Sequence, residues 1–147
     1  MKNLIDLQEE VNKKIDDLKI SNYRPNIIAV SKTFPIEKIK PLIEYGHTHF
    51  GENKVQEAVE KWTNEKEKNP DICLHMIGKL QTNKVKFAVK LFDYIHSVDS
   101  IKLAKKIAEE QNKLNKKVKL FIQVNLNNEG QKSGISIDLV NSLLESC

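Results

Sequence analysis

Lys32 is the residue whose type and position most directly suggest chemistry. It ends the tetrapeptide AVSK at residues 29–32, which follows the β-branched pair Ile27 and Ile28 and precedes a Thr-Phe-Pro sequence. Lysine is among the residues least often fully buried. A lysine at the point where a buried strand gives way to a helix therefore has two interpretations: it leaves the sheet edge for water, or its amine reacts in a pocket.

The second interpretation rests on how a pocket changes an amine. An amine held among apolar walls loses hydration of its charged form, so its pKa falls and neutral amine becomes available at neutral pH. Neutral amine attacks aldehydes to form a Schiff base, and pyridoxal phosphate is the common cofactor held in this way. The residues alone leave both interpretations open, because lysines after a strand commonly face solvent.

The elements that must position Lys32 alternate along the chain. An amphipathic helix is predicted within the first twenty residues, where Leu4, Leu7 and Val11 recur at helical spacing. Five strand-like segments follow at residues 26–30, 48–50, 74–77, 94–97 and 119–125. Helical patterns lie at residues 36–43, 55–62, 85–92, 101–108 and from 137 onward, with Asp99 or Ser100 as a candidate cap. This alternation predicts α/β units on a parallel sheet, in one domain.

Polar residues and glycines gather where the predicted strands end. They are Ser31, Lys32, Gly51, Glu52, Asn53, Gly78, Ser97 and Asn125. In a parallel barrel the carboxyl ends of the strands and their loops build the active site, and in an open doubly wound sheet the crevice lies beyond the same ends. Both architectures predict that Lys32 lies in a pocket.

The composition narrows the classes of function. The net charge of +4 comes from 24 basic and 20 acidic residues that are interleaved along the chain, which gives weak grounds for nucleic-acid binding. No apolar stretch near the N-terminus is long enough for a signal peptide or a membrane span, so we expect a cytoplasmic protein without membrane contact. Two cysteines give neither a disulfide framework nor a set of metal ligands.

Five motifs together resemble one family. They are AVSK at 29–32, FGENKVQE at 50–57, LHMIGKLQTNK at 74–84, HSVDS at 96–100 and QVNLNNEGQKSG at 123–134. In order and spacing they are similar to the pyridoxal phosphate homeostasis proteins, the YggS/PROSC group, which are related in fold to the barrel domain of alanine racemase. The resemblance covers the chain from about residue 20 to its end. Lys54 and Lys79 depart from the family pattern and add charge near the pocket rim.

The resemblance implies a partial TIM (β/α)8 barrel of PLP fold type III, with about five βα units plus an N-terminal helix. Residues 1–147 would then form a single incomplete PLP-binding barrel domain, because an eight-unit barrel typically needs about 200 residues or more. We expect a C-terminally truncated member of the family, without the loops after strands seven and eight that usually grip phosphate. The open sheet would expose a strand edge and an apolar face.

The resemblance also implies site residues. Lys32 would carry pyridoxal phosphate as a Schiff base, and the residues that would line or support the pocket are Asn53, His75, Ile77, Ser97 and Asn125. Structural alternatives stay open for several polar residues. Asn53 could cap the helix that runs from Lys54, and His75 could be a satisfied core histidine. The same holds for Gln81 and Asn83 as caps of the third βα helix, and for Glu129 and Lys132 as a solvated ion pair.

The implied function is that of a carrier. The protein would hold pyridoxal phosphate reversibly on Lys32, take part in intracellular homeostasis of the cofactor and pass it to apoenzymes, without established catalytic activity. One alternative is an amino acid racemase-like enzyme that uses Lys32 as its single base, and another is an inert half-barrel. Binding is favoured over catalysis because Tyr23, Tyr45 and Tyr94 fall outside the strand-end motifs, so none matches the tyrosine base of alanine racemase.

Overall fold

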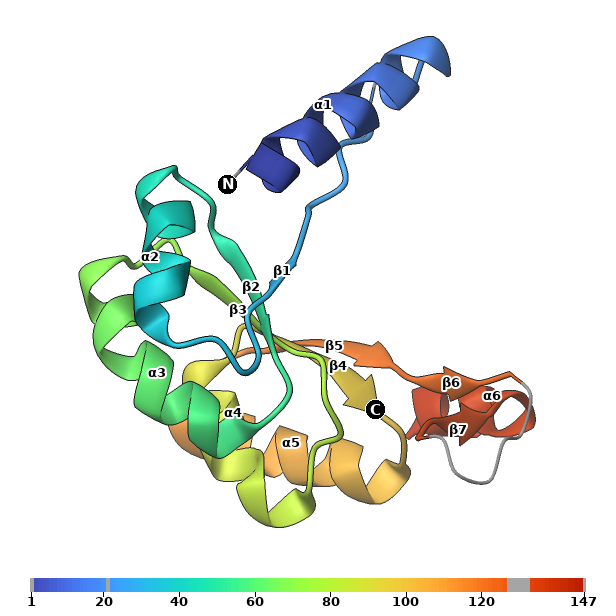
Figure 1. The fold of residues 1–147 in the computed structure, drawn as a ribbon. Coiled ribbons are helices and arrows are strands. Elements are labelled where there is room, and N and C mark those ends of the chain that lie inside the picture. Colours follow the sequence, from blue (N-terminus) through green and yellow to red (C-terminus); the bar gives the residue numbers. More distant parts are fainter. Residues whose placement is uncertain (1, 21, 127–132, 147) are drawn as a thin grey trace.

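The computed structural model describes residues 2–20, 22–126 and 133–146 (Figure 1). Helix α1 (Lys2–Asp17) comes first and projects from the rest of the chain. The alternating elements are β1 (Ala29–Val30), α2 (Ile36–Glu44), β2 (His49–Glu52), α3 (Val55–Lys68), β3 (Cys73–Met76), η1 (Thr82–Lys84), α4 (Val85–Leu91), β4 (Tyr94–Val98), α5 (Ile101–Leu114) and β5 (Lys119–Ile122). The last described elements are β6 (Val124–Asn125), β7 (Ile135–Ser136), η2 (Ile137–Leu139) and α6 (Val140–Glu145).

The central sheet has five parallel strands in the order β1-β2-β3-β4-β5, which confirms the predicted α/β class. Each strand pairs with the next one in sequence, as successive right-handed βα units require. Within the described residues the sheet is open, with β1 and β5 as its edges. All five carboxyl ends therefore lie along the same edge of the sheet, which we call the carboxyl edge.

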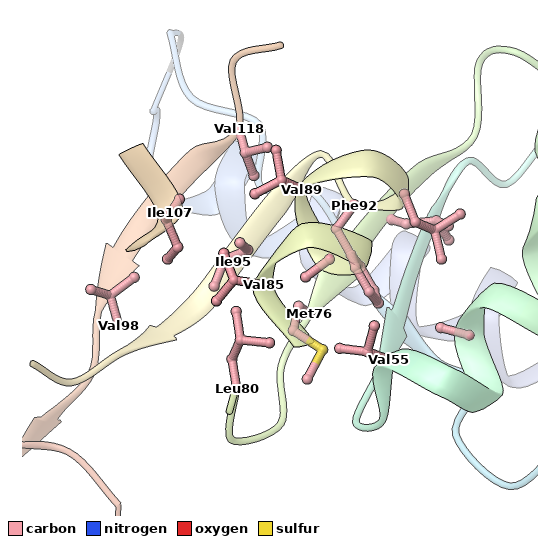
Figure 2. Packing of buried hydrophobic residues seen from close by; sticks show 14 of the residues in the cluster. Val55, Met76, Leu80, Val85, Val89, Phe92, Ile95, Val98, Ile107 and Val118 are labelled. Carbon is pink, nitrogen blue, oxygen red and sulfur yellow. The ribbon is translucent and has the colours of Figure 1, made fainter. Parts of the chain in front are cut away.

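The core lies between the sheet and helices α2 to α5, which cover one face of it. Phe50 and Leu74 are paired across the sheet and fully buried, and Phe50 packs on Trp62 of α3 with 4.9 Å between ring centroids. Figure 2 shows Met76, Val85 and Ile95 in the same cluster. Because side chains alternate along a strand, the residues between these point to the other face, which we call the histidine face after His49, His75 and His96.

Two predicted strands differ from the observed ones by more than two residues at one end. The segment 26–30 forms only the short β1, because an edge strand has a single neighbour to pair with. The segment 119–125 divides at Gln123, whose amide donates to the carbonyl of Val98 while its own carbonyl accepts from Ile135. The chain thus leaves the central sheet and pairs β6 with β7 in a second, two-stranded sheet. Glu129 and Lys132 lie outside the described residues.

The observed helix starts decide which of the predicted capping residues cap a helix. Ser100 does cap α5, where its hydroxyl accepts from the amide of Leu103 at 3.3 Å. Asn53 does not cap α3, because the helix begins one residue later than a cap at Asn53 requires and Lys54 occupies the N-cap position. The same prediction fails for Gln81, which precedes η1 without a side-chain cap bond, and for Asn83, which lies inside that turn.

Candidate functional site

The carboxyl edge brings Lys32, Asn53 and Ile77 to the same level. The amide of Ser31 continues the ladder by donating to the carbonyl of Gly51 at 2.9 Å, and the amide of Ile77 donates to the carbonyl of Glu52 at 3.0 Å. Ser97 lies near the end of β4, and its buried Oγ has no hydrogen-bond partner among the described residues. Asn125 is placed in β6, outside the five-stranded sheet.

Lys32 sits in a tight turn directly after β1. The amide of Phe34 donates to the carbonyl of Ser31 at 3.2 Å, and the hydroxyl of Thr33 donates to the carbonyl of Lys32 at 2.6 Å. Thr33 has a φ of +66°, in the left-handed region that glycine usually occupies at this turn position. Such a backbone costs about 1–3 kcal/mol and persists only where surrounding contacts fix it.

Those contacts centre on Glu52, whose side chain is fully buried. Its Oε1 accepts hydrogen bonds from Ser31 Oγ at 2.7 Å, Lys61 Nζ at 2.8 Å and Trp62 Nε1 at 2.9 Å. Lys61 Nζ also donates to the carbonyl of Ser31 at 2.8 Å. A buried carboxylate is tolerable only when it is paired and hydrogen-bonded in this way.

Lys32 itself differs from the expectation of an amine among apolar walls. Its side chain is exposed, whereas the preceding Ser31 is buried at 4% exposure. The reason is the open sheet: β1 has β2 on one side and no strand on the other within the described residues. No hydrogen bond or ion pair engages the Lys32 amine within the described part of the chain, so the amine is available to a ligand.

The histidine face carries a row of three hydrogen-bonded imidazoles. Nε2 of His75 lies 2.9 Å from Nδ1 of His49, and Nδ1 of His75 lies 2.9 Å from Nε2 of His96. The His75 ring stacks on Tyr94 with centroids 4.4 Å apart. The pKa of His75 is lowered from 6.5 to about 4, chiefly by burial and in smaller measure by the neighbouring imidazoles of His96 and His49. His75 is therefore buried, neutral at pH 7 and satisfied, as the core-histidine alternative predicts.

His75 lies below the mouth of the site. It pairs with Gly51, which pairs in turn with Val30, two residues before Lys32. His75 is therefore one layer of side chains deeper than the residues of the carboxyl edge. Tyr94 stacks on His75, and its hydroxyl accepts a hydrogen bond from Lys119 Nζ at 3.0 Å, at the first residue of β5 rather than at the carboxyl edge.

The loops after β2 and β3 meet closely at the rim. A Cβ added to Gly78 would lie 2.2 Å from the carbonyl oxygen of Asn53, so only glycine fits there. Beside this contact, a cavity of about 260 Å³ is lined by Asn53, Lys54, Val55, Gln56, Lys79, Gln81 and Lys84. The two lysines that the sequence placed at the pocket rim thus both border this cavity.

Sequence reasoning missed Lys61 and Trp62 as hydrogen-bond partners of Glu52. Both lie on α3, nine and ten residues after Glu52, and both reach back to the same carboxylate oxygen. A buried glutamate at a strand end followed by a helix with an inward-facing Lys-Trp pair is the only available signal, and it has meaning only once the register of β1 and β2 is known.

The profile of the family "Alanine racemase, N-terminal domain" matches residues 10–147. The chain belongs to that family. Two curated proteins illustrate which proteins this chain is similar to. The pyridoxal phosphate homeostasis protein of Pasteurella multocida is 37% identical over 133 residues, which are 90% of this chain and 57% of that protein. Its counterpart in Escherichia coli K12 is 35% identical over 112 residues, 76% of this chain and 48% of that protein.

Solved structures agree with the alanine racemase N-terminal domain assignment. PipY of Synechococcus elongatus, with PLP bound, matches with a TM-score of 0.73 and 38% identity, over 92% of this chain and 63% of that one. The alanine racemase of Clostridium difficile matches with a TM-score of 0.64 at 15% identity, over 96% of this chain and 36% of that one, which shows the shared fold alone. The chain spans about half the length of the curated relatives it matches.

The five parallel strands and their helices therefore form part of the barrel of this family. Among the described residues, no helix combines the length and apolar character needed to cross a membrane.

Proposed function

We propose that this chain binds pyridoxal 5′-phosphate through the amine of Lys32 and takes part in cytoplasmic homeostasis of that cofactor. The observation that carries the proposal is the position of Lys32: an exposed amine, without a hydrogen bond or ion pair to the described residues, on a fixed turn at the carboxyl edge of a parallel sheet. The PipY relative whose structure contains PLP supports the same cofactor.

The side chains at the carboxyl edge suit this cofactor. When bound, pyridoxal phosphate supplies an aldehyde that condenses with a primary amine to give a Schiff base. Lys32 offers that amine, while Asn53 offers a polar contact and Ile77 an apolar one. The Ser97 hydroxyl is buried and has no hydrogen-bond partner among the described residues, so Ser97 supports the pocket from within the fold. His75 supports the layer beneath, and Asn125 is the proposed contact from the segment after β5.

Retention of the cofactor by this chain should be weak. The Lys32 side chain is exposed, so water reaches the attachment point from the open side of β1. The barrel loops that usually grip phosphate follow strands seven and eight, and the described residues supply five strands of the central sheet. The described residues by themselves are therefore expected to hold the cofactor less tightly than a complete barrel of the family would.

A carrier fits the site better than an enzyme. Racemisation of this kind uses an acid/base group on each side of the cofactor, and the Tyr94 hydroxyl is bonded to Lys119 at the start of β5, away from the carboxyl edge. Reversible attachment at one lysine suits transfer to apoenzymes, which we propose as partners. The absence of proton exchange at the Cα of alanine in deuterated buffer would separate the carrier from a racemase-like enzyme.

The test is a spectroscopic titration of the purified chain with pyridoxal phosphate. The wild-type chain should develop the visible absorption band of a lysine-bound Schiff base, and Lys32→Ala should lose it. Lys38→Ala is the matched control, because Lys38 is an equally exposed lysine on α2, and this variant should bind as the wild type does. A band of undiminished strength in Lys32→Ala contradicts the proposal.

A further inference from the structure

We propose that Glu52 is a positioning residue for Lys32. Its buried carboxylate anchors Ser31, and Ser31 fixes the turn that presents the Lys32 amine at the carboxyl edge. The consequence for cofactor binding rests on the proposed function, whereas the consequence for the turn itself does not.

The anchoring engages every polar group of Ser31. Its amide donates to the carbonyl of Gly51, and its hydroxyl donates to Glu52 Oε1 at 2.7 Å. Its carbonyl accepts from Lys61 Nζ at 2.8 Å and from the amide of Phe34 at 3.2 Å. Because backbone rotation at Ser31 would break several of these bonds together, the direction in which the chain enters Lys32 is fixed.

The other side of Lys32 shows why such an anchor is needed. Thr33 has a φ of +66°, an unfavourable backbone for a β-branched residue. Left unanchored, the turn would relax toward a negative φ at Thr33 and swing Lys32 with it. Strained residues of this kind persist where neighbouring contacts over-determine the local structure, and Ser31, tied to Glu52 and Lys61, supplies those contacts.

The three donors to Glu52 can be separated experimentally. Ser31 connects the carboxylate to the Lys32 turn, whereas Trp62 Nε1 connects it to α3 and touches no residue of the turn through that bond. Ser31→Ala therefore removes the direct hydrogen bond between the turn and Glu52, while Lys61 and Trp62 still donate to Oε1. Trp62→Phe removes a hydrogen bond to the same oxygen and leaves the link in place, so it is the matched control.

The first readout uses the chain without cofactor. The exchange rate of the Phe34 amide reports closure of the turn. In Ser31→Ala this rate should rise about tenfold over the wild type, beyond any change due to global stability, as expected for loss of one anchoring hydrogen bond. Ser31→Thr keeps a hydroxyl and should retain slow exchange. Trp62→Phe should lower global stability with no selective effect on Phe34.

The second readout is affinity for pyridoxal phosphate, measured by titration. Ser31→Ala should weaken binding about 5- to 10-fold, Ser31→Thr should restore it, and Trp62→Phe should stay within about twofold of the wild type when all chains are fully folded. Glu52→Gln should resemble Ser31→Ala in both readouts; if it does not fold, Ser31→Ala decides the question.

The outcomes separate the two proposals. If the wild-type chain binds no pyridoxal phosphate at Lys32, the proposed function fails, and Phe34 exchange alone still decides whether Glu52 positions the turn. The inference is overturned if Ser31→Ala leaves Phe34 exchange unchanged, or if Trp62→Phe accelerates it to the same extent. Equal losses of affinity in Ser31→Ala and Trp62→Phe would also overturn it, because they would show that Glu52 only stabilises the fold.

Discussion

Acid should destabilise this fold through His75. Burial among neutral rings disfavours the imidazolium and lowers the pKa of His75 from 6.5 to about 4. The unfolded chain therefore takes up a proton at higher pH than the folded chain does, so stability is fully present above pH 6.5 and falls as the pH drops toward 4. A difference of about 2.5 pKa units at 1.36 kcal/mol each gives a loss of up to about 3 kcal/mol.

The assay is urea denaturation at several pH values between 8 and 4, for the wild type and for His75→Gln. The variant is less stable at neutral pH because His49 and His96 lose their partner, but it should lose about 3 kcal/mol less than the wild type over this pH interval. Charged groups distant from His75 contribute alike to both chains, so their contribution to the pH dependence cancels in the difference. Lys38→Gln is the control, because Lys38 is exposed on α2 and lies outside the row, so this variant should lose stability with acid as the wild type does.

Two results would refute the reasoning about His75. One is a His75→Gln variant whose stability falls with acid as steeply as that of the wild type. The other is an NMR titration in which the His75 ring takes up its proton near pH 6.5, the ordinary value for histidine.

Two further substitutions probe the contacts that support the site. Lys61→Met should lower the free energy of unfolding by about 3–5 kcal/mol, because it leaves the buried carboxylate of Glu52 without its counter-ion. Lys68 is the control: its side chain is 68% exposed, so Lys68→Met should lower the free energy of unfolding by under about 1 kcal/mol. Equal effects of the two lysines in urea denaturation would contradict this. Gly78→Ala should lower the free energy of unfolding by about 1–3 kcal/mol, because the new methyl would meet the Asn53 carbonyl at 2.2 Å and force the loops after β2 and β3 apart. A thermal melt that matches the wild type would contradict this, since it would show that these loops separate freely.

The sequence predicts the elements of this fold well because their signals are local. Apolar spacing identified the helices at residues 36–43 and 101–108, and the structure extends them only to Glu44 and Leu114. Strand ends were harder, because pairing rather than composition decides them. The segment 119–125 reads as one apolar strand, but Gln123 changes partner from β4 to β7 and divides it.

The surroundings of Lys32 show what local patterns cannot supply. Lys32 was found from its type and position, but its exposure follows from the open edge of the sheet. The bond between Ser31 and Glu52 depends on the register of β1 against β2, and the reach of Lys61 depends on how α3 packs. The positive φ of Thr33 opposes the preference of threonine, so no propensity argument predicts it.

The central claim is that Lys32 is the attachment point for pyridoxal phosphate. The most direct measurement is borohydride reduction of the chain incubated with the cofactor, followed by peptide mapping of the modified lysine by mass spectrometry. The account predicts that the label lies on the peptide containing Lys32 and disappears in Lys32→Ala. Labelling spread over exposed lysines such as Lys38 and Lys79, with no preference for Lys32, would contradict it.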